Sequence, residues 1–158
     1  MAKEIERKFL LANEAWREQA CAGVYMCQGY MGEAKHASVR IRVEGEQANI
    51  NIKSATLGIS RMEYEYAIPK DEALEMLNTL CERPLIEKTR YKVVVGEHVW
   101  EIDVFEGENA GLVVAEVELE SEEQPFEKPD WIGEEVSDDP RYYNVCLVKH
   151  PFKDWAGN

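Results

Sequence analysis

Charged side chains recur at alternate positions along this sequence, and their types and spacing could support chemistry. The sets are Glu4, Glu6 and Lys8; Arg40 and Arg42; Glu63 and Glu65; Lys88, Arg90 and Lys92; Glu101 and Asp103; and Glu116, Glu118 and Glu120. Because alternate residues of a β-strand share one face, the members of each set would project together. Clustered Lys and Arg could bind a small polyanion, and carboxylate clusters suit Mg²⁺ or Mn²⁺, which also bridge to phosphate oxygens.

A solvent-exposed sheet face rich in salt bridges is the alternative explanation of this pattern. Two observations argue against it. Paired acids and paired bases are segregated onto different segments, and the positions between them are apolar enough to pack against helices, as at Ile5 and Phe9 or at Trp100 and Ile102. If the charged face lined an enclosed space, burial would be costly for each ion unless it were paired or bound. A small polyanion held together with divalent cations would satisfy such a lining.

The elements that would position these side chains are β-strands. Alternation with period two predicts strands at residues 3–10, 24–31, 37–44, 48–54, 61–69, 86–95, 98–106 and 113–121, with hairpin turns at 44–47 and 95–98. The short connections favour an antiparallel meander. Eight strands that close into a barrel leave room for side chains or for one small ligand.

Helices are expected at three places beside the strands. Asn13 can cap a helix over residues 14–21, Asp71 begins a second helix that ends before Pro84, and a third is expected over 142–149. The apolar face of the second helix consists of Ala73, Leu74, Leu77 and Leu80. The acidic, proline-containing stretch 122–141 is expected to be an irregular connection, and residues 151–158 are expected to be frayed.

The length of 158 residues suits a single domain, expected to span residues 1–158. We expect the fold class to be α+β and mainly β, with an eight-stranded antiparallel closed barrel over about residues 3–121. The irregular segment and the third helix would follow over about 122–150, and the helices would flank the barrel.

Composition and charge exclude several classes of function. The formal net charge of −13 disfavours nucleic acids and anionic membranes as partners, because a basic surface binds those. No apolar run is long enough to cross a membrane, and the charged N-terminus lacks the apolar region of a secretion signal, so we expect a cytoplasmic protein. The four cysteines lack metal-ligand spacing and are expected to be buried, reduced thiols. A homodimer is left open.

The ordered charged motifs resemble those of one known family. The opening Glu4-Ile-Glu6-Arg-Lys8 is similar to the ExExK signature of the CYTH superfamily, the triphosphate tunnel metalloenzymes. The further motifs follow in the family's order: VRIR with Arg40 and Arg42, NIK with Lys53, RMEYE with Glu63 and Glu65, EKTRY with Lys88 and Arg90, EIDVF with Asp103, and VAEVELE with Glu116 and Glu118. The later WIGEEVSDDPRYYN resembles the C-terminal segment of small bacterial members.

This resemblance implies a barrel that forms a tunnel and a role for each motif residue. The residues that would grip the triphosphate are Arg40, Arg42, Lys53, Lys88 and Arg90. Those that would hold Mg²⁺ or Mn²⁺ are Glu4, Glu6, Asp103, Glu116 and Glu118. Glu63 and Glu65 would orient the bases or a metal-bound water. Lys8 and Tyr30 match a lysine and tyrosine pair that activates water in relatives, and Lys8 could alternatively remain charged and stabilise the phosphate. Arg141 is either a further phosphate contact or a plain salt bridge.

The leading functional prediction is metal-dependent hydrolysis of a linear triphosphate, with inorganic tripolyphosphate cleaved to pyrophosphate and phosphate. Alternatives within the resemblance are a nucleoside triphosphatase and a class IV-type adenylate cyclase. Either would need a platform for an organic group, for which Tyr25, Tyr66, Trp131 and Trp155 are candidates unless they are packing residues. An alternative of another class is a non-catalytic sensor of polyphosphate or nucleotides.

Overall fold

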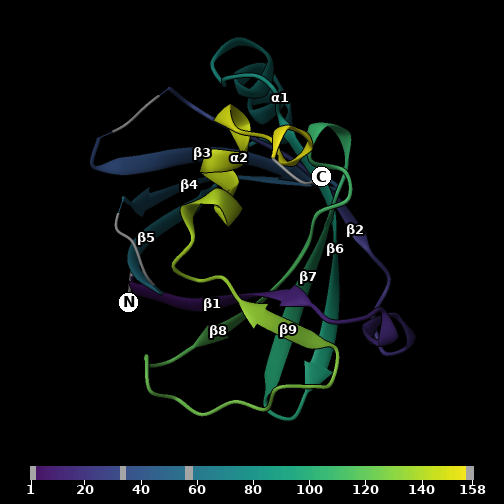
Figure 1. Cartoon of the computed structure of the whole chain (residues 1–158). Coiled ribbons are helices and arrows are strands. Elements are labelled where there is room, and N and C mark those ends of the chain that lie inside the picture. Colours follow the sequence, from purple (N-terminus) through teal and green to yellow (C-terminus); the bar gives the residue numbers. More distant parts are fainter. Residues whose placement is uncertain (1–2, 33–34, 56–58, 156–158) are drawn as a thin grey trace.

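Antiparallel β-strands form most of the structure, a computed structural model that describes residues 3–32, 35–55 and 59–155 (Figure 1). The strands in the described ranges are β1 (Lys3–Leu11), β2 (Val24–Tyr30), β3 (Ala37–Glu44), β4 (Gln47–Ser54), β5 (Ser60–Ala67), β6 (Ile86–Val95), β7 (His98–Phe105), β8 (Val113–Leu119) and β9 (Ile132–Glu135). The predicted strands β1 to β8 are thus confirmed, with ends that shift by no more than about two residues. The two predicted hairpins are also present, and their turns place Gly45 and Gly96 at a φ of 61°, a conformation that glycine adopts without a steric penalty.

The sheet closes into a barrel, as predicted. Its strand order is β5-β4-β3-β2-β6-β7-β8-β1, and β1 pairs back onto β5, with Lys3 opposite Met62 and Ile5 opposite Ser60. The expected simple meander is wrong at two connections. The chain passes from β1 to β2 and from β5 to β6 between strands that are not neighbours, and the second connection contains the helix α1 (Lys70–Thr79), so that β1 pairs with β5 and β2 pairs with β6.

The ninth strand lies in the stretch expected to be irregular, and that expectation is therefore wrong for residues 132–135. β9 pairs with the C-terminal part of β1, where Leu11 lies opposite Ile132. A side chain at Gly133 would place its Cβ 3.1 Å from the backbone oxygen of Leu10, a tight contact, so glycine favours the close approach of β9 to β1. A four-residue strand with this composition shows no apolar alternation that a sequence pattern could detect.

Helical segments cover the outside and one end of the barrel. They are η1 (Ala15–Glu18), α1 (Lys70–Thr79), η2 (Gly107–Asn109), η3 (Pro140–Tyr142), α2 (Asn144–Lys149) and η4 (Phe152–Asp154), where η denotes a 3₁₀ turn. The helix predicted over 14–21 is only the short η1, and Asn13 accepts a hydrogen bond from the backbone N–H of Ala15 at 2.9 Å. The predicted third helix is present as α2.

Helix α1 packs on the outer face of β3 and β4 through a narrower stripe than predicted. Ala73 and Leu77 are buried against Ile41 and neighbouring residues, whereas Leu74 and Leu80 are 44% and 57% exposed. Leu74 is rotated by about 100° from Ala73 around the helix axis, and Leu80 lies beyond the last helical residue. The predicted apolar face is therefore wrong for these two leucines.

An apolar cluster closes one end of the barrel. It joins side chains of the barrel strands to α2 and the segment after it, and consists of Tyr30, Ile86, Phe105, Leu112, Val114, Val136, Tyr142, Leu147, Val148 and Trp155. The ring of Trp155 lies 5.1 Å from that of Tyr142 and 5.0 Å from that of Phe152. Residues 151–155 are therefore packed rather than frayed as predicted, and residues 156–158 lie outside the described ranges.

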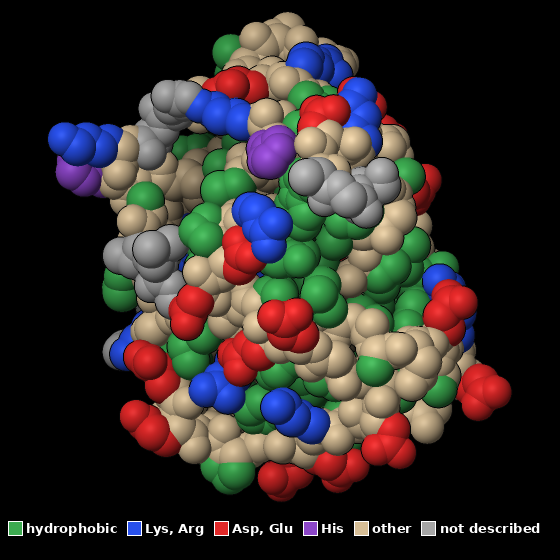
Figure 2. Space-filling view, viewed as in Figure 1, with side chains coloured by type: hydrophobic (Ala, Val, Ile, Leu, Met, Phe, Trp, Pro, Cys, Tyr) green, Lys and Arg blue, Asp and Glu red, His purple; other side chains and the backbone are tan. Residues whose placement is uncertain are grey.

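The outer surface carries much of the negative charge. Figure 2 shows acidic side chains gathered over the lower part of one face. Within the described residues, no helix is both long enough and apolar enough to cross a membrane. All four cysteines are unpaired thiols, but Cys21 is exposed and Cys27, Cys81 and Cys146 are only half-buried, so the expectation of buried thiols is wrong.

Candidate active site

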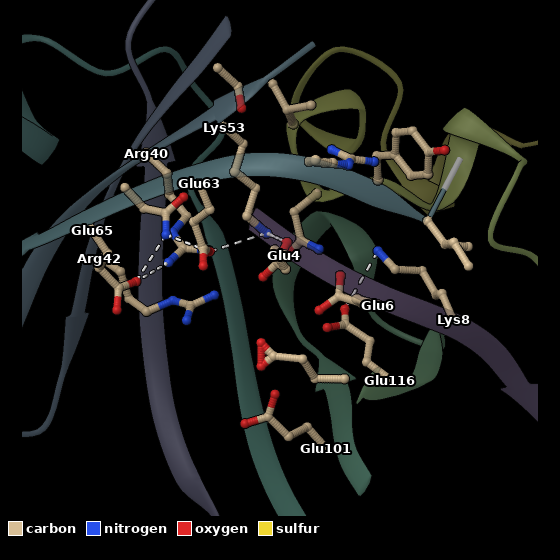
Figure 3. A pocket seen from close by; sticks show the side chains of 18 of the residues that line it. Glu4, Glu6, Lys8, Arg40, Arg42, Lys53, Glu63, Glu65, Glu101 and Glu116 are labelled. Atoms are coloured by element: carbon tan, nitrogen blue, oxygen red, sulfur yellow. Dashed lines mark hydrogen bonds and ion pairs between the residues drawn. The ribbon is translucent and has the colours of Figure 1, made fainter. Parts of the chain in front are cut away.

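The lumen of the barrel contains a cavity of about 260 Å³, and almost all of its lining is polar or charged (Figure 3). Its lining side chains include Glu4, Glu6, Lys8, Tyr30, Arg40, Arg42, Asn51, Lys53, Arg61, Glu63, Glu65, Lys88, Arg90, Glu101, Glu116, Glu118, Ser137, Tyr143 and Asn144. Every residue predicted for the site is among them except Asp103 and Arg141. The alternating charges therefore face inward, while the intervening apolar residues pack outside.

The strand order divides this cavity into two electrostatic halves. The neighbouring strands β4, β3, β2 and β6 form one side, on which β4, β3 and β6 carry the bases and β2 carries Tyr30. The neighbouring strands β7, β8, β1 and β5 contribute the carboxylates, together with the bases Lys8 and Arg61. Figure 3 shows Arg40 and Arg42 on one side and Glu6, Glu101 and Glu116 on the other. A ligand that carries several negative charges and binds cations would match both halves at once.

A buried carboxylate binds two of the bases in the basic half. Asp103 is 1% exposed, and its two oxygens accept hydrogen bonds from Lys88 Nζ and Arg90 Nε, each at 2.7 Å. Although burial alone would raise the pKa of Asp103, the charges of Arg90 and Lys88 hold it well below its usual range. Asp103 lies behind the bases and does not line the cavity.

Two bases in this half have lowered pKa values. Burial lowers the pKa of Lys88 to about 7; Asp103 opposes the shift, and Arg90 and Arg42 add to it. Burial together with Arg40 and Arg90 lowers the pKa of Arg42 to about 10. Positive charge is thus in excess on this side, a condition that an anionic ligand would relieve.

The acidic half carries an excess of negative charge. Glu4 contacts Lys53 at 3.0 Å, and Glu116 contacts Lys8 at 3.5 Å. Burial, together with the carboxylates of Glu116 and Glu4, raises the pKa of Glu6 well above its usual value. Burial, Glu63 and Glu101 also raise the pKa of Glu118. A divalent cation would relieve this repulsion, and a set of carboxylate oxygens suits Mg²⁺ or Mn²⁺, so the residues present fit such an ion.

The carboxylates are engaged with bases rather than gathered around one point. Among the described residues, no group of three or more Asp, Glu, His or Cys side chains is already arranged so that it could hold a metal ion. Glu4 Oε1 and Glu63 Oε2 lie 3.0 and 3.8 Å from Lys53 Nζ. Burial would lower the pKa of Lys53, but Glu6 and Glu4 raise it overall. Lys53 therefore comes from a base-bearing strand but contacts carboxylates of the acidic half.

Lys8 and Tyr30 both line the cavity but have different partners. Lys8 Nζ donates a hydrogen bond to the backbone oxygen of Tyr142 at 3.2 Å, in addition to its contact with Glu116. Tyr30 Oη accepts a hydrogen bond from Gln28 Nε2 at 3.2 Å. The sequence therefore predicted correctly that both residues reach the same space, but their hydrogen bonds do not join them into a pair.

Glu63 and Glu65 lie beside the bases, in the positions expected of residues that orient them. Glu65 accepts a hydrogen bond from Arg40 Nη2 at 3.3 Å. Asn51 donates to both Glu63 and Glu65 at 2.9 Å. Arg141, in contrast, is exposed and binds Asp139 at 2.8 Å. This arrangement is the plain salt bridge, one of the two roles considered for Arg141.

Several cavity residues were missed by the sequence reasoning. Asn51 and Arg61 are in phase with Lys53 and Glu63 on their strands, so the same alternation could have found them. Arg61 lies 4.5 Å from the centre of the Tyr143 ring, a cation–π contact. Tyr143 and Asn144 come from the C-terminal segment, where no periodicity predicts which side chains face the lumen.

The aromatic residues considered as an organic platform do not line the cavity. Trp131 and Trp155 are buried in apolar clusters, and Tyr25 and Tyr66 are 47% and 59% exposed. Tyr25 donates a hydrogen bond to Glu87 instead. The cavity therefore lacks the stacking platform that these four residues were expected to provide for a nucleotide.

Comparison with known proteins agrees with this geometry. The chain is 51% identical over 155 residues to an inorganic triphosphatase of Acetivibrio thermocellus, covering 98% of this chain and 99% of that protein. An inorganic triphosphatase of Nitrosomonas europaea is 40% identical over 150 residues, covering 92% and 96%. The crystal structure of an inorganic triphosphatase with 36% identity has a TM-score of 0.67 and covers 94% of this chain and 95% of that one.

The extent of the family match accounts for both the barrel and its charged lumen. The match to the CYTH domain runs over residues 2–143 and so contains all strands and every cavity-lining side chain from Glu4 to Tyr143. The expectation that residues 1–158 form one domain stays a prediction. The resemblance drawn from the ordered charged motifs is confirmed, and the chain belongs to the CYTH domain family.

Proposed function

We propose that this protein hydrolyses inorganic triphosphate to pyrophosphate and phosphate with the help of a divalent cation. The observation that carries the proposal is the division of one small cavity into a cationic half and a carboxylate half. The activity named for the relatives at 51% and 40% identity supports the same reaction. Both halves are needed, because phosphoryl transfer depends on positioning and on neutralising charge.

The cationic half would bind the substrate. Arg40, Arg42, Lys53, Lys88 and Arg90 would hold the phosphate oxygens, as the motif resemblance implies. Arg61 also faces the cavity and would add a further guanidinium to the opposite side. Because the five bases other than Arg61 each contact a neighbouring carboxylate or amide, little of their side-chain freedom is lost when the substrate binds.

The carboxylate half would hold the metal, and we assign Glu4, Glu6, Glu116 and Glu118 to this role, with Mg²⁺ or Mn²⁺ as the ion. Bound there, such an ion would neutralise charge on the phosphate chain and lower the pKa of a coordinated water. Asp103 was predicted as a further ligand, but both of its oxygens are occupied by Lys88 and Arg90. We therefore propose that Asp103 positions those two bases instead.

Proton transfer from the attacking water is the remaining requirement. Lys8 and Tyr30, which the resemblance implies as the pair that activates water, both line the cavity. Lys88 Nζ donates to Asp103 at 2.7 Å and to Asn144 at 3.0 Å, as expected of a cation that binds phosphate. We propose that Lys8 accepts the proton, that Tyr30 helps to orient the water, and that Lys88 contacts phosphate as a cation. The water oxygen then bonds to phosphorus as the bond to the bridging oxygen breaks, and pyrophosphate leaves.

The size of the cavity favours an inorganic substrate over a nucleotide. Its volume of about 260 Å³ is below the roughly 300–1,000 Å³ typical of pockets for drug-sized ligands. The proposed platform residues also lie elsewhere, which disfavours a nucleoside triphosphatase or an adenylate cyclase. The cytoplasmic location and the homodimer considered from the sequence stay predictions.

Phosphate release under matched conditions tests the proposal. Tripolyphosphate, ATP, GTP and thiamine triphosphate would be compared at equal concentration with Mg²⁺, Mn²⁺, Ca²⁺ or EDTA. We expect metal-dependent release that is fastest with tripolyphosphate, abolished in Glu6→Ala and retained in Glu127→Ala, a substitution at an exposed position outside the cavity. Faster release from ATP would indicate a nucleotide enzyme. Stabilisation by tripolyphosphate without any release would indicate a sensor and refute catalysis.

A further inference from the structure

Two neutral amide side chains lie beneath the cationic half of the cavity, and neither has a role in the motif resemblance. Gln28, on β2, is fully buried, with 0% of its surface exposed. Its Oε1 accepts a hydrogen bond from Arg42 Nε at 2.8 Å, and its Nε2 donates to Asn144 Oδ1 at 3.2 Å. Asn144, the first residue of α2, also accepts from Lys88 Nζ at 3.0 Å through the same oxygen. The amides therefore connect two buried bases.

The direction of this chain is fixed by its ends. A guanidinium and an ammonium can only donate hydrogen bonds, so Arg42 must meet the oxygen of Gln28, and Lys88 must meet the oxygen of Asn144. The nitrogen of Gln28 is then left to donate, and it reaches both Asn144 and the hydroxyl of Tyr30, the latter at 3.2 Å. A single arrangement of hydrogen bonds thus orients Arg42, Lys88 and Tyr30, which all line the cavity.

Neutrality is the property that suits amides to this position. Asp103 also holds Lys88, but as a carboxylate it cancels positive charge as it does so. An amide satisfies the buried donors of Arg42 and Lys88 and leaves their charge available for an anionic ligand. An apolar residue at either amide position would leave a buried cationic donor unsatisfied. A carboxylate would cancel positive charge in the cationic half, which would bind the phosphate groups.

The chain of hydrogen bonds also joins distant parts of the fold. Gln28 and Asn144 are 116 residues apart in the sequence, and Asn144 lies where α2 meets β2 and β6 at the closed end of the barrel. Removing Asn144 would therefore take one hydrogen bond from Lys88 and one from Gln28 at the same time. Lys88 would keep its contact with Asp103, and Gln28 its contact with Arg42, but both bases would be held in less defined orientations although neither had been changed.

We propose that Gln28 and Asn144 are positioning residues that orient Arg42 and Lys88 toward the bound triphosphate and connect the docking of α2 to turnover. This inference rests on the proposed triphosphatase function. Since the Oδ1 of Asn144 accepts a hydrogen bond from the charged Lys88, we expect loss of Asn144 to lower kcat/KM for tripolyphosphate about 10- to 100-fold. At about 1.4 kcal/mol per tenfold change, this loss corresponds to about 1.4–2.8 kcal/mol.

The test compares Asn144→Ala with Asn144→Asp and with a control at Asn109. Asn109 is buried, and its Oδ1 accepts a hydrogen bond from the backbone N–H of Phe152 at 2.8 Å, so Asn109→Ala also disturbs the C-terminal segment but touches no cavity residue. We expect Asn144→Ala to lower kcat/KM and Asn109→Ala to leave it within about twofold of wild type. Asn144→Asp keeps the shape and the acceptor but adds negative charge, and should act mainly by raising KM.

Non-additivity provides a second readout that a merely structural role would not produce. If the two amides act as one unit, the double variant Gln28→Ala/Asn144→Ala should lose little more kcat/KM than the worse single variant. Equal losses in Asn109→Ala and Asn144→Ala would overturn the inference, as would wild-type kinetics in folded Asn144→Asp. If Asn144→Ala fails to fold, Asn144→Asp alone decides between these results.

The results would differ from these if the protein were not a triphosphatase. In that case the wild-type protein would release no phosphate, and calorimetric binding of tripolyphosphate would replace kinetics. We then expect Asn144→Asp to weaken binding about 10-fold or more and Asn109→Ala to leave it unchanged. Equal binding by the wild type and Asn144→Asp would refute the positioning role independently of catalysis.

Discussion

Replacing Asp103 with asparagine should destabilise the protein far more than the same change at an exposed Asp–Arg pair. Asp103 is 1% exposed and binds Arg90 through both oxygens, with nitrogen–oxygen distances of 2.7 and 2.9 Å, and also binds Lys88. Asp103→Asn keeps the shape but leaves Lys88 without its paired carboxylate and Arg90 with only the more distant Glu101, at 3.3 Å. Breaking a buried ion pair by removing one partner costs about 3–5 kcal/mol. At about 2–4 °C per kcal/mol for a protein of this size, Tm should fall by about 6–20 °C.

Asp139 supplies the matched control. Both of its oxygens accept hydrogen bonds from the Arg141 guanidinium, Oδ1 from Nε at 3.2 Å and Oδ2 from Nη2 at 2.8 Å, but on the protein surface. Exposed ion pairs contribute about 0–1 kcal/mol, so Asp139→Asn should change the free energy of unfolding by less than about 1 kcal/mol. Urea and thermal unfolding of the wild type and both variants would be measured at pH 7 without metal or phosphate.

The pH dependence of the difference provides an internal check. The folded-state pKa of Asp103 lies well below that of the unfolded chain, which is about 3.9. Its contribution to stability is therefore fully present above that value and is lost as the pH falls below it. The difference in the free energy of unfolding between wild type and Asp103→Asn should therefore shrink as the pH falls below about 3.9. Equal effects of the two substitutions at pH 7 would refute the claim that Asp103 compensates buried charge.

Three further predictions concern the cavity and the helix that covers the barrel. Since the pKa of Lys88 is about 7, kcat/KM for tripolyphosphate should fall as the pH increases through 7, because Lys88 then loses the charge that binds phosphate, and Lys88→Arg should remove this fall; a rise that Lys88→Arg removes would instead make Lys88 the base. Glu6→Gln should raise Tm in EDTA at pH 8, where the ionised carboxylate is disfavoured because its folded-state pKa is raised, and should abolish the stabilisation by Mg²⁺. Leu77→Ala should cost about 2–5 kcal/mol in urea unfolding, whereas Leu74→Ala at an exposed site should cost less than about 1 kcal/mol.

The residues that could be predicted from the sequence are those on long alternating strands. Glu4, Glu6 and Lys8 are in phase, and so are Lys88 and Arg90, because a strand repeats its faces every two residues. Once the charged face was inferred to line the lumen, each of these side chains was placed correctly. Asp103 shares the phase of Glu101 but lies deeper, covered by the two bases that it binds, and alternation carries no information about depth.

Other parts of the site depend on contacts that no local pattern encodes. Asn144 reaches the lumen because α2 docks at the end of the barrel. This docking depends on the packing of Leu147 and Val148 in the apolar cluster there. Gln28 is a single uncharged residue among charged strands, and it gave no signal on its own. The same holds for β9, whose position depends on a close approach between Gly133 and the backbone of β1.

The two electrostatic halves arise from two crossovers, one between β1 and β2 and one between β5 and β6. In a simple meander, β5 would lie between β4 and β6, and its acids, Glu63 and Glu65, would adjoin bases on both sides. The observed order instead places β5 against β1 and β6 beside β2. The acid-bearing strands β7, β8, β1 and β5 are then contiguous, and the base-bearing strands β4, β3 and β6 lie opposite them, with β2 between β3 and β6. Charges segregated strand by strand thus become charges segregated across a cavity. The two crossovers, rather than any charged residue, place bases and acids on opposite sides of one space.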